Sequence, residues 1–142
     1  AYGMAWHYDR PYDATNLSSQ RLLFPQSATN QIYEIPLDGS PPVAYNRLID
    51  EVNISPNGDE LVYNIGQTGY KCTYSSGNFG PQIPLGVTGC SFEFSPTGDR
   101  LVFDRQGGTA GVLDLWIADA DGSNARLLTD GLAHQDDASW GR

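Results

Sequence analysis

Two pairs of neighbouring carboxylates are the residues whose type and spacing most suggest chemistry. Asp50-Glu51 and Asp136-Asp137 each precede a short segment in which polar and apolar residues alternate as in a strand. Carboxylate oxygens are hard ligands, and Ca²⁺ takes about six to eight of them. If the two segments line one channel, we expect these side chains to meet at its mouth and hold a cation. An acidic rim in contact with water is the competing interpretation.

A second candidate surface combines aromatic rings with small polar side chains. Tyr70, Tyr74 and Phe79 lie close together in the sequence, with Asn78 and several Ser and Gly residues among them. Rings beside small hydrogen-bonding groups are suited to contact with carbohydrate or protein. The alternative is a long surface loop held by a disulfide.

The two cysteines, Cys72 and Cys90, are the candidates for that disulfide. They are 18 positions apart, and no further Cys or His stands at a zinc-binding spacing from them. A bridge and two free buried thiols both agree with this count.

The sequence contains no recognisable catalytic group. His7 and His134 are the only histidines, and no Gly-x-Ser-x-Gly elbow accompanies them. Residues 107–111 are rich in glycine, but no helix follows whose N-terminus could bind phosphate. Residues 119–122 (Asp-Ala-Asp-Gly) lack the ligand order of an EF-hand loop and indicate a hairpin turn. We therefore predict that the protein is not an enzyme.

The composition excludes several classes of protein. The chain has 142 residues and a net charge of −9, which disfavours binding to nucleic acid or to an anionic membrane. A hydrophobic content of 39% argues against disorder, and 16 Gly with 9 Pro favour turns over helices. No apolar run is long enough for a membrane-spanning helix. The first residues lack the basic and apolar regions of a signal peptide, as those of a processed chain also would.

An internal repeat must position the candidate residues. Residues 54–65 and 94–105 share the pattern Ser-Pro-x-Gly-Asp-x-Leu-Val-aromatic at an offset of 40 positions. A degenerate copy stands at residues 18–24, and another copy begins at residues 138–140. A period near 40 in a strand-rich sequence is typical of a four-stranded propeller blade, whose innermost strand lines the axial channel.

The turns of the repeat follow from their residue types. In Ser-Pro-x-Gly, Pro fixes φ at the second position and Gly accepts a positive φ at the fourth. Asp38-Gly39 and Asp121-Gly122 predict hairpins. Residues 66–90 depart from the pattern, with residues 69–78 in place of the expected third strand. Residues 89–91 (Gly-Cys-Ser) supply no carboxylate at the start of the third unit, which favours the acidic-rim interpretation.

Residues 92–140 resemble the TolB-type β-propeller repeat. The motifs are Ser-Pro-Thr-Gly-Asp-Arg-Leu-Val-Phe, then Leu-Trp-Ile-Ala-Asp-Ala-Asp-Gly, then His-Gln-Asp-Asp-Ala-Ser-Trp. Residues 50–65 are similar, and residues 18–49 match in pattern only. The resemblance implies an all-β propeller, and by analogy it implies a protein-binding or surface role.

The repeat divides the chain into one short segment, three blades and the start of a fourth. The expected boundaries are 1–17 for the N-terminal segment, 18–51, 52–90 and 91–137 for the blades, and 138–142 for the first strand of a further blade. Propellers usually close with about four to eight blades, so three blades leave two open flanks.

We expect another chain to complete the ring. In this hypothesis Ala138, Ser139 and Trp140 of one chain add the innermost strand to the first blade of the next chain, and Trp6 competes for that position. Two chains would give six blades, and an exchange that does not close would give a filament. A fragment of a longer propeller is the alternative.

These inferences combine into one prediction of function. We predict a non-enzymatic, extracytoplasmic scaffold for binding or self-assembly, whose partners are further copies of itself and a protein or carbohydrate ligand. Ca²⁺ is the one cofactor that the residues suggest, and we expect neither nucleic acid binding nor membrane insertion. The alternatives are a secreted lectin, with or without calcium, and a propeller fragment of a larger TolB-like or peptidase-associated protein.

Overall fold

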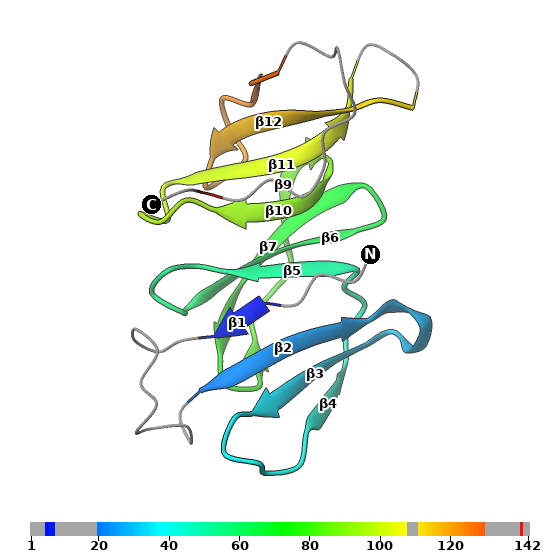
Figure 1. The fold of residues 1–142 in the computed structure, drawn as a ribbon, viewed down its shortest axis with the longest axis vertical. Coiled ribbons are helices and arrows are strands. Elements are labelled where there is room, and N and C mark those ends of the chain that lie inside the picture. The colour runs from blue at the N-terminus through cyan, green and yellow to red at the C-terminus, as the bar shows by residue number, and fades with distance from the viewer. Residues whose placement is uncertain (1–4, 8–19, 108–110, 130–139, 141–142) are drawn as a thin grey trace.

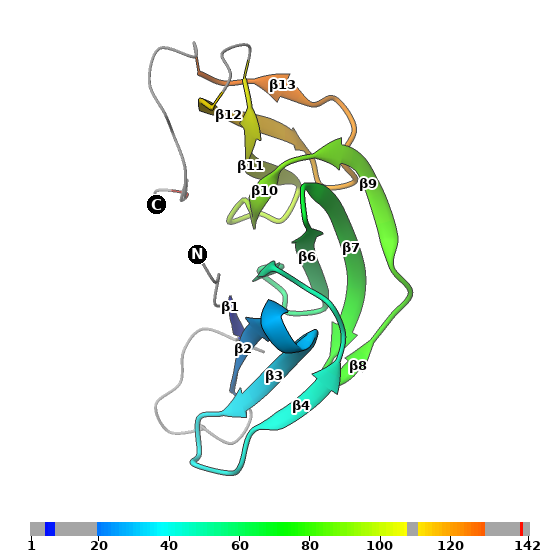
Figure 2. The ribbon, with the colours of Figure 1, turned by 90° about the vertical axis from the view of Figure 1, so that its right-hand side faces the viewer.

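The computed structural model describes residues 5–7, 20–107, 111–129 and 140, and these form three antiparallel β-sheets. One 3-10 turn (η2, Ser27–Thr29) is the only helical element among them, and no described helix could span a membrane. The sheets follow one another along the long axis (Figure 1) and bend into an arc (Figure 2). The prediction of an all-β chain with about three blades is confirmed.

Blade 1 contains four strands in the order β1-β2-β3-β4. Their bounds are β1 (Ala5–His7), β2 (Arg21–Gln26), β3 (Gln31–Pro36) and β4 (Val43–Asn46). The innermost strand therefore comes from the chain's own N-terminal part, where the backbone of Trp6 pairs with that of Leu22. The N-terminal segment 1–17, expected as a docking or exchanged strand, supplies this strand through Ala5–His7. Of the two segments that compete for this position, Trp6 holds it within its own chain, so residues 138–140 of another chain are not needed to fill it.

Blade 2 has three regular strands and a bulged outer edge. Its strands are β5 (Glu51–Ile54), β6 (Glu60–Ile65), β7 (Thr68–Ser75), β8 (Asn78–Phe79) and β9 (Ile83–Thr88), and both β8 and β9 pair with β7. The departing segment is therefore a regular third strand and not a loop. Its many Ser and Gly residues suggested a loop, whereas Tyr and Thr at alternate positions favour a strand.

Blade 3 repeats the arrangement with β10 (Cys90–Phe94), β11 (Arg100–Gln106), β12 (Leu113–Asp119) and β13 (Arg126–Leu127). The predicted Ser-Pro-x-Gly turns are confirmed in blades 2 and 3. Gly58 and Gly98 have φ of 81° and 77°, and each donates its N–H to the serine carbonyl three residues earlier at 2.8 Å. The same turn chemistry therefore gives the same geometry twice.

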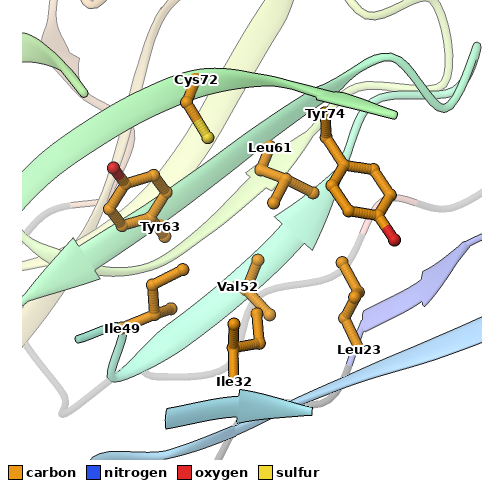
Figure 3. Close-up of a cluster of buried hydrophobic side chains, with 8 residues drawn as sticks. All are labelled: Leu23, Ile32, Ile49, Val52, Leu61, Tyr63, Cys72 and Tyr74. Atoms are coloured by element: carbon orange, nitrogen blue, oxygen red, sulfur yellow. The ribbon is translucent and has the colours of Figure 1, made fainter. Parts of the chain in front are cut away.

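Two hydrophobic clusters join the blades face to face. The seam between blades 1 and 2 (seam 1–2) buries the eight side chains of Figure 3, namely Leu23, Ile32, Ile49, Val52, Leu61, Tyr63, Cys72 and Tyr74. The seam between blades 2 and 3 (seam 2–3) buries Val62, Leu85, Phe92, Phe94, Leu101, Phe103 and Ala118. Strand β6 serves both seams because successive side chains point to opposite faces of a sheet.

Candidate binding surfaces

The predicted channel-mouth carboxylates of blade 2 are engaged in hydrogen bonds. Asp50 Oδ2 accepts the N–H of Gly66 at 2.6 Å, and Glu51 Oε2 accepts the N–H of Ser91 at 2.7 Å and its hydroxyl at 3.1 Å. Among the described residues, no three His, Cys, Asp or Glu side chains are grouped closely enough to hold a metal ion. Asp136 and Asp137 lie outside those residues, so the cation site stays a prediction.

The inner strands of neighbouring blades are joined by polar contacts. Asn53 Oδ1 on β5 accepts the N–H of Phe94 on β10 at 3.1 Å. Trp140 lies beside β10 of its own chain, where its indole Nε1 donates to the carbonyl of Glu93 at 3.5 Å. Ala138 and Ser139 are outside the described residues. Trp140 thus adjoins the inner strand of blade 3, next to which a further blade would begin.

The predicted disulfide is not present, because Cys72 and Cys90 are both free. Cys72 is buried in seam 1–2. The Cys90 sulfur contacts the carbonyl of Gly66, just before β7 begins, at 3.8 Å. Cys72 lies four residues beyond Thr68 along β7. At about 3.3 Å per residue, that separation is too large for a bridge.

The environment of each thiol keeps it protonated. Burial raises the pKa of Cys72, and burial followed by the charges of Glu51, Asp104 and Asp50 raises the pKa of Cys90. Since the thiolate is the reactive form, both cysteines are poor nucleophiles in the folded chain.

Tyr74 is a core residue and not part of an exposed aromatic surface. Its ring is 2% exposed, and its hydroxyl donates to Glu34 Oε2 at 2.6 Å. Glu34 Oε1 also accepts from Ser76 Oγ at 3.3 Å and pairs with Arg21 Nε at 3.2 Å. We call this group the polar link of seam 1–2. Burial, followed by the bond to Glu34 and its charge, raises the pKa of Tyr74.

A hollow of about 570 Å³ opens at one end of blade 2. It lies between the Ser-Pro-Asn-Gly turn and the β7–β8 hairpin. Its lining residues are Asn57, Asp59, Glu60, Thr73, Tyr74, Ser75, Asn78, Phe79 and Gly80. Three of the four residues predicted for the aromatic surface are among them, whereas Tyr70 is elsewhere and stacks on Tyr63 with ring centroids 5.8 Å apart. In the sequence, Asn57, Asp59 and Glu60 stand out only as residues of the repeat.

Arg47 holds the aromatic side of the hollow in place. Its guanidinium lies 5.4 Å from the centroid of the Phe79 ring and 5.8 Å from that of Tyr63. Its Nη2 donates to the Tyr63 hydroxyl at 3.1 Å and to the carbonyl of Gly80 at 3.3 Å. In the sequence Arg47 stands alone in the linker before β5, and no motif there signals this role.

The outer face of blade 1 is apolar and has no described element packed over it. Leu23 and Ile32 face blade 2, so the alternating side chains of β2 and β3 face the opposite way. These outward side chains are Leu22, Phe24, Tyr33 and Ile35, and all four are partly exposed. On blade 3, Leu115 and Ile117 of β12 face away from seam 2–3 and are partly exposed as well.

The comparison with solved structures identifies the architecture. The chain matches a structure titled nidogen/laminin complex with a TM-score of 0.63 at 11% identity, covering 89% of this chain and 47% of that one. It matches TolB from Acinetobacter baumannii with a TM-score of 0.62 at 19% identity, covering 90% of this chain and 32% of that one. The fold is that of a partial β-propeller.

A further match supports the same fold. A TolB structure from Agrobacterium tumefaciens aligns with a TM-score of 0.56 at 16% identity, over 89% of this chain and 47% of that one. No family model and no curated protein matches the sequence. The chain spans less than half the length of each of these propeller structures, and at these identities the likeness concerns the fold alone.

Proposed function

We propose that the chain is a non-enzymatic propeller scaffold whose open flanks bind further blades, supplied by a second copy of the chain. The observation that carries this proposal is the apolar outer face of blade 1, with Leu22, Phe24, Tyr33 and Ile35 partly exposed. Blades in a propeller pack face to face, and the two internal seams show how completely such packing buries similar side chains. Leu23 and Ile32, on the covered face of the same blade, are 0% exposed.

The second copy would contribute the opposite flank. Leu115 and Ile117 on the outer face of its blade 3 are complementary in character to the blade 1 face of the first copy. Such a contact is heterologous, so it closes if the rotation permits and otherwise continues as a filament. Two copies would give six blades, within the usual range of about four to eight. Because β1 completes blade 1, the copies associate by stacking faces rather than by exchanging strands.

We also propose a location outside the cytoplasm, by analogy with the TolB-type repeat. The free cysteines are neutral on this point, since Cys72 is buried and the pKa of both thiols is raised. A piece of a longer propeller remains the alternative, in which further blades of the same polypeptide cover the flanks. The intact mass of the naturally produced protein separates the two.

The oligomeric state across a dilution series tests the proposal. We expect light scattering to show association of the 15.5 kDa chain and Phe24→Asp to abolish it, because a charge cannot be buried unpaired in the new seam. Gln82→Asp introduces the same charge at an exposed position of blade 2, away from both flanks, and should leave association unchanged. A folded monomer at every concentration would contradict self-assembly.

A further inference from the structure

We infer that the hollow on blade 2 is a binding site for a neutral sugar unit of a carbohydrate. This site lies within one chain, so it does not depend on the association proposed above. The inference rests on a comparison of blade 2 with blade 3, on the hydrogen-bonding groups that line the hollow, and on its size.

The hollow exists because the outer hairpin of blade 2 extends further than that of blade 3. Tyr74 donates its N–H to the carbonyl of Asp59 at 2.8 Å, and Ala120 donates to that of Asp99 at 3.0 Å, so these positions are equivalent. In blade 3 the chain turns back at once, with the N–H of Asp119 donating to the carbonyl of Ser123 at 2.9 Å. In blade 2, β7 continues to Ser75 and returns as β8, which forms the wall of the hollow.

A difference at one position of the repeat changes the hydrogen bonds that its aspartate carboxylate accepts. In blade 3, Asp99 Oδ1 accepts hydrogen bonds from Thr97 Oγ1 at 2.5 Å and from Ser95 Oγ at 3.1 Å. In blade 2 the residue at the position of Thr97 is Asn57, whose Oδ1 takes the hydroxyl of Ser55 at 2.7 Å.

Asp59 is consequently available to a ligand. A serine hydroxyl has one proton to donate, and the Ser55 hydroxyl lies 3.5 Å from Asp59, farther than from Asn57. The exposed Asp59 therefore offers carboxylate oxygens at the hollow, where Asp99 of blade 3 has its oxygen engaged.

The mixture of groups favours a sugar over a cation. Asp59 and Glu60 accept hydrogen bonds, the amide of Asn57 and the hydroxyl of Thr73 donate them, and Phe79 adds an apolar wall. Sugar hydroxyls both donate and accept, and the C–H groups of the ring suit an aromatic surface.

Charge and size agree with this choice. Lys71 Nζ lies 3.4 Å from Glu60 Oε1 and offsets one negative charge, and the described residues hold no group of three metal ligands. The volume of about 570 Å³ is within the range of small-molecule sites, roughly 300–1,000 Å³.

A glycan array followed by titration tests the site. We would probe the full chain with the array, with and without EDTA, and then titrate the methyl glycosides of glucose, galactose, mannose and N-acetylglucosamine by NMR. Asp59→Ala should weaken binding about tenfold or more, because it removes a charge-assisted hydrogen bond. Asp99→Ala, the matched change in blade 3, should leave the affinity within about twofold.

A second variant separates a ligand contact from a structural role. Asn57→Thr introduces the residue that engages the carboxylate in blade 3, so it should weaken sugar binding several-fold while the melting temperature stays unchanged. Absence of binding to every glycoside and array member would overturn the inference. Equal losses in Asp59→Ala and Asp99→Ala, or binding that disappears with EDTA, would also overturn it.

Discussion

The two seams of the arc share one backbone arrangement but differ in chemistry. Seam 2–3 is built on phenylalanine, with Phe92 and Phe103 stacked at a centroid distance of 4.8 Å. Seam 1–2 contains tyrosines and encloses the polar link of Tyr74, Glu34 and Arg21. The apolar contacts of seam 1–2 are not directional, whereas each hydrogen bond of the polar link requires a particular distance and angle between donor and acceptor.

The two seams also differ in how closely the blades that they join match the sequence repeat. Blades 2 and 3 both carry the Ser-Pro-x-Gly turn, and their inner strands are joined by the bonds from Glu51 to Ser91 and from Asn53 to Phe94. Blade 1 is degenerate and lacks that turn. Each seam thus combines apolar packing with directional hydrogen bonds, which converge on Glu34 in seam 1–2 and join the inner strands across seam 2–3.

Truncation in the apolar seam should have the largest effect. Phe103 is 0% exposed, so Phe103→Ala removes a fully buried ring and leaves a cavity beside Phe92. We expect a loss of about 3–5 kcal/mol in the free energy of unfolding, measured by urea denaturation. A loss below about 1 kcal/mol would show that seam 2–3 contributes little to stability.

Removal of one hydroxyl from the polar link should cost less. Tyr74→Phe keeps the ring and deprives buried Glu34 of a donor, so we expect a loss of about 1.5–3 kcal/mol. Tyr70→Phe, a matched change at a partly exposed ring, should alter stability by less than about 0.5 kcal/mol. Equal effects in the two variants would contradict a special role for the link.

Alkaline pH should weaken seam 1–2 through the same tyrosine. The pKa of Tyr74 is raised above its ordinary value of 10.0 in the folded chain, so the folded state retains a proton that the unfolded state loses. The contribution of this raised pKa to the free energy of unfolding is complete below about pH 10. It falls above that pH, by up to about 1.4 kcal/mol per pH unit.

The Tyr74→Phe variant provides the control. Urea denaturation between pH 9 and pH 11 should give a shallower decline in Tyr74→Phe than in the unmodified chain. Parallel declines would mean that other groups, such as Tyr63, whose pKa burial also raises, dominate the alkaline transition.

The two thiols should differ in their reactivity towards a maleimide in the folded protein. Cys72 is 1% exposed within seam 1–2, whereas Cys90 is partly exposed at the start of β10. A maleimide should label Cys90 slowly in the folded protein and Cys72 only after unfolding, as read by mass spectrometry. Reducing agent should leave the urea midpoint unchanged, and a shift in that midpoint would indicate a disulfide.

Local features with strong turn chemistry could be predicted from the sequence. The turn at Asp121-Gly122 forms as expected, with Gly122 at φ 86° and the N–H of Ser123 bonded to Asp121 Oδ1 at 2.9 Å. The segment of β7 looks like a loop in the sequence because its hairpin turns through Ser76 at φ 30° and Gly77 at φ 81°. Both are common loop residues, and a positive φ at serine is not predictable from residue type.

Long-range placements could not be predicted. Nothing in the sequence near Cys90 indicates that it lies beside Gly66, or that Glu34 meets a tyrosine 40 positions later. The choice between Trp6 and residues 138–140 for the inner strand of blade 1 likewise depended on which segment pairs with β2. Such pairings depend on the whole packed arrangement rather than on local preference.

The sequence alone determined the period, the turns and the alternation of side chains, because these follow from local backbone geometry and from the two-residue repeat of a strand. The tertiary structure decided which faces meet. It buried Tyr74 on Glu34, kept the two thiols apart, and set the β7–β8 hairpin over the turn at Asn57 to form the hollow. These outcomes required contacts between residues that are distant in the chain, and burial and hydrogen bonding select such contacts only once the sheets are stacked.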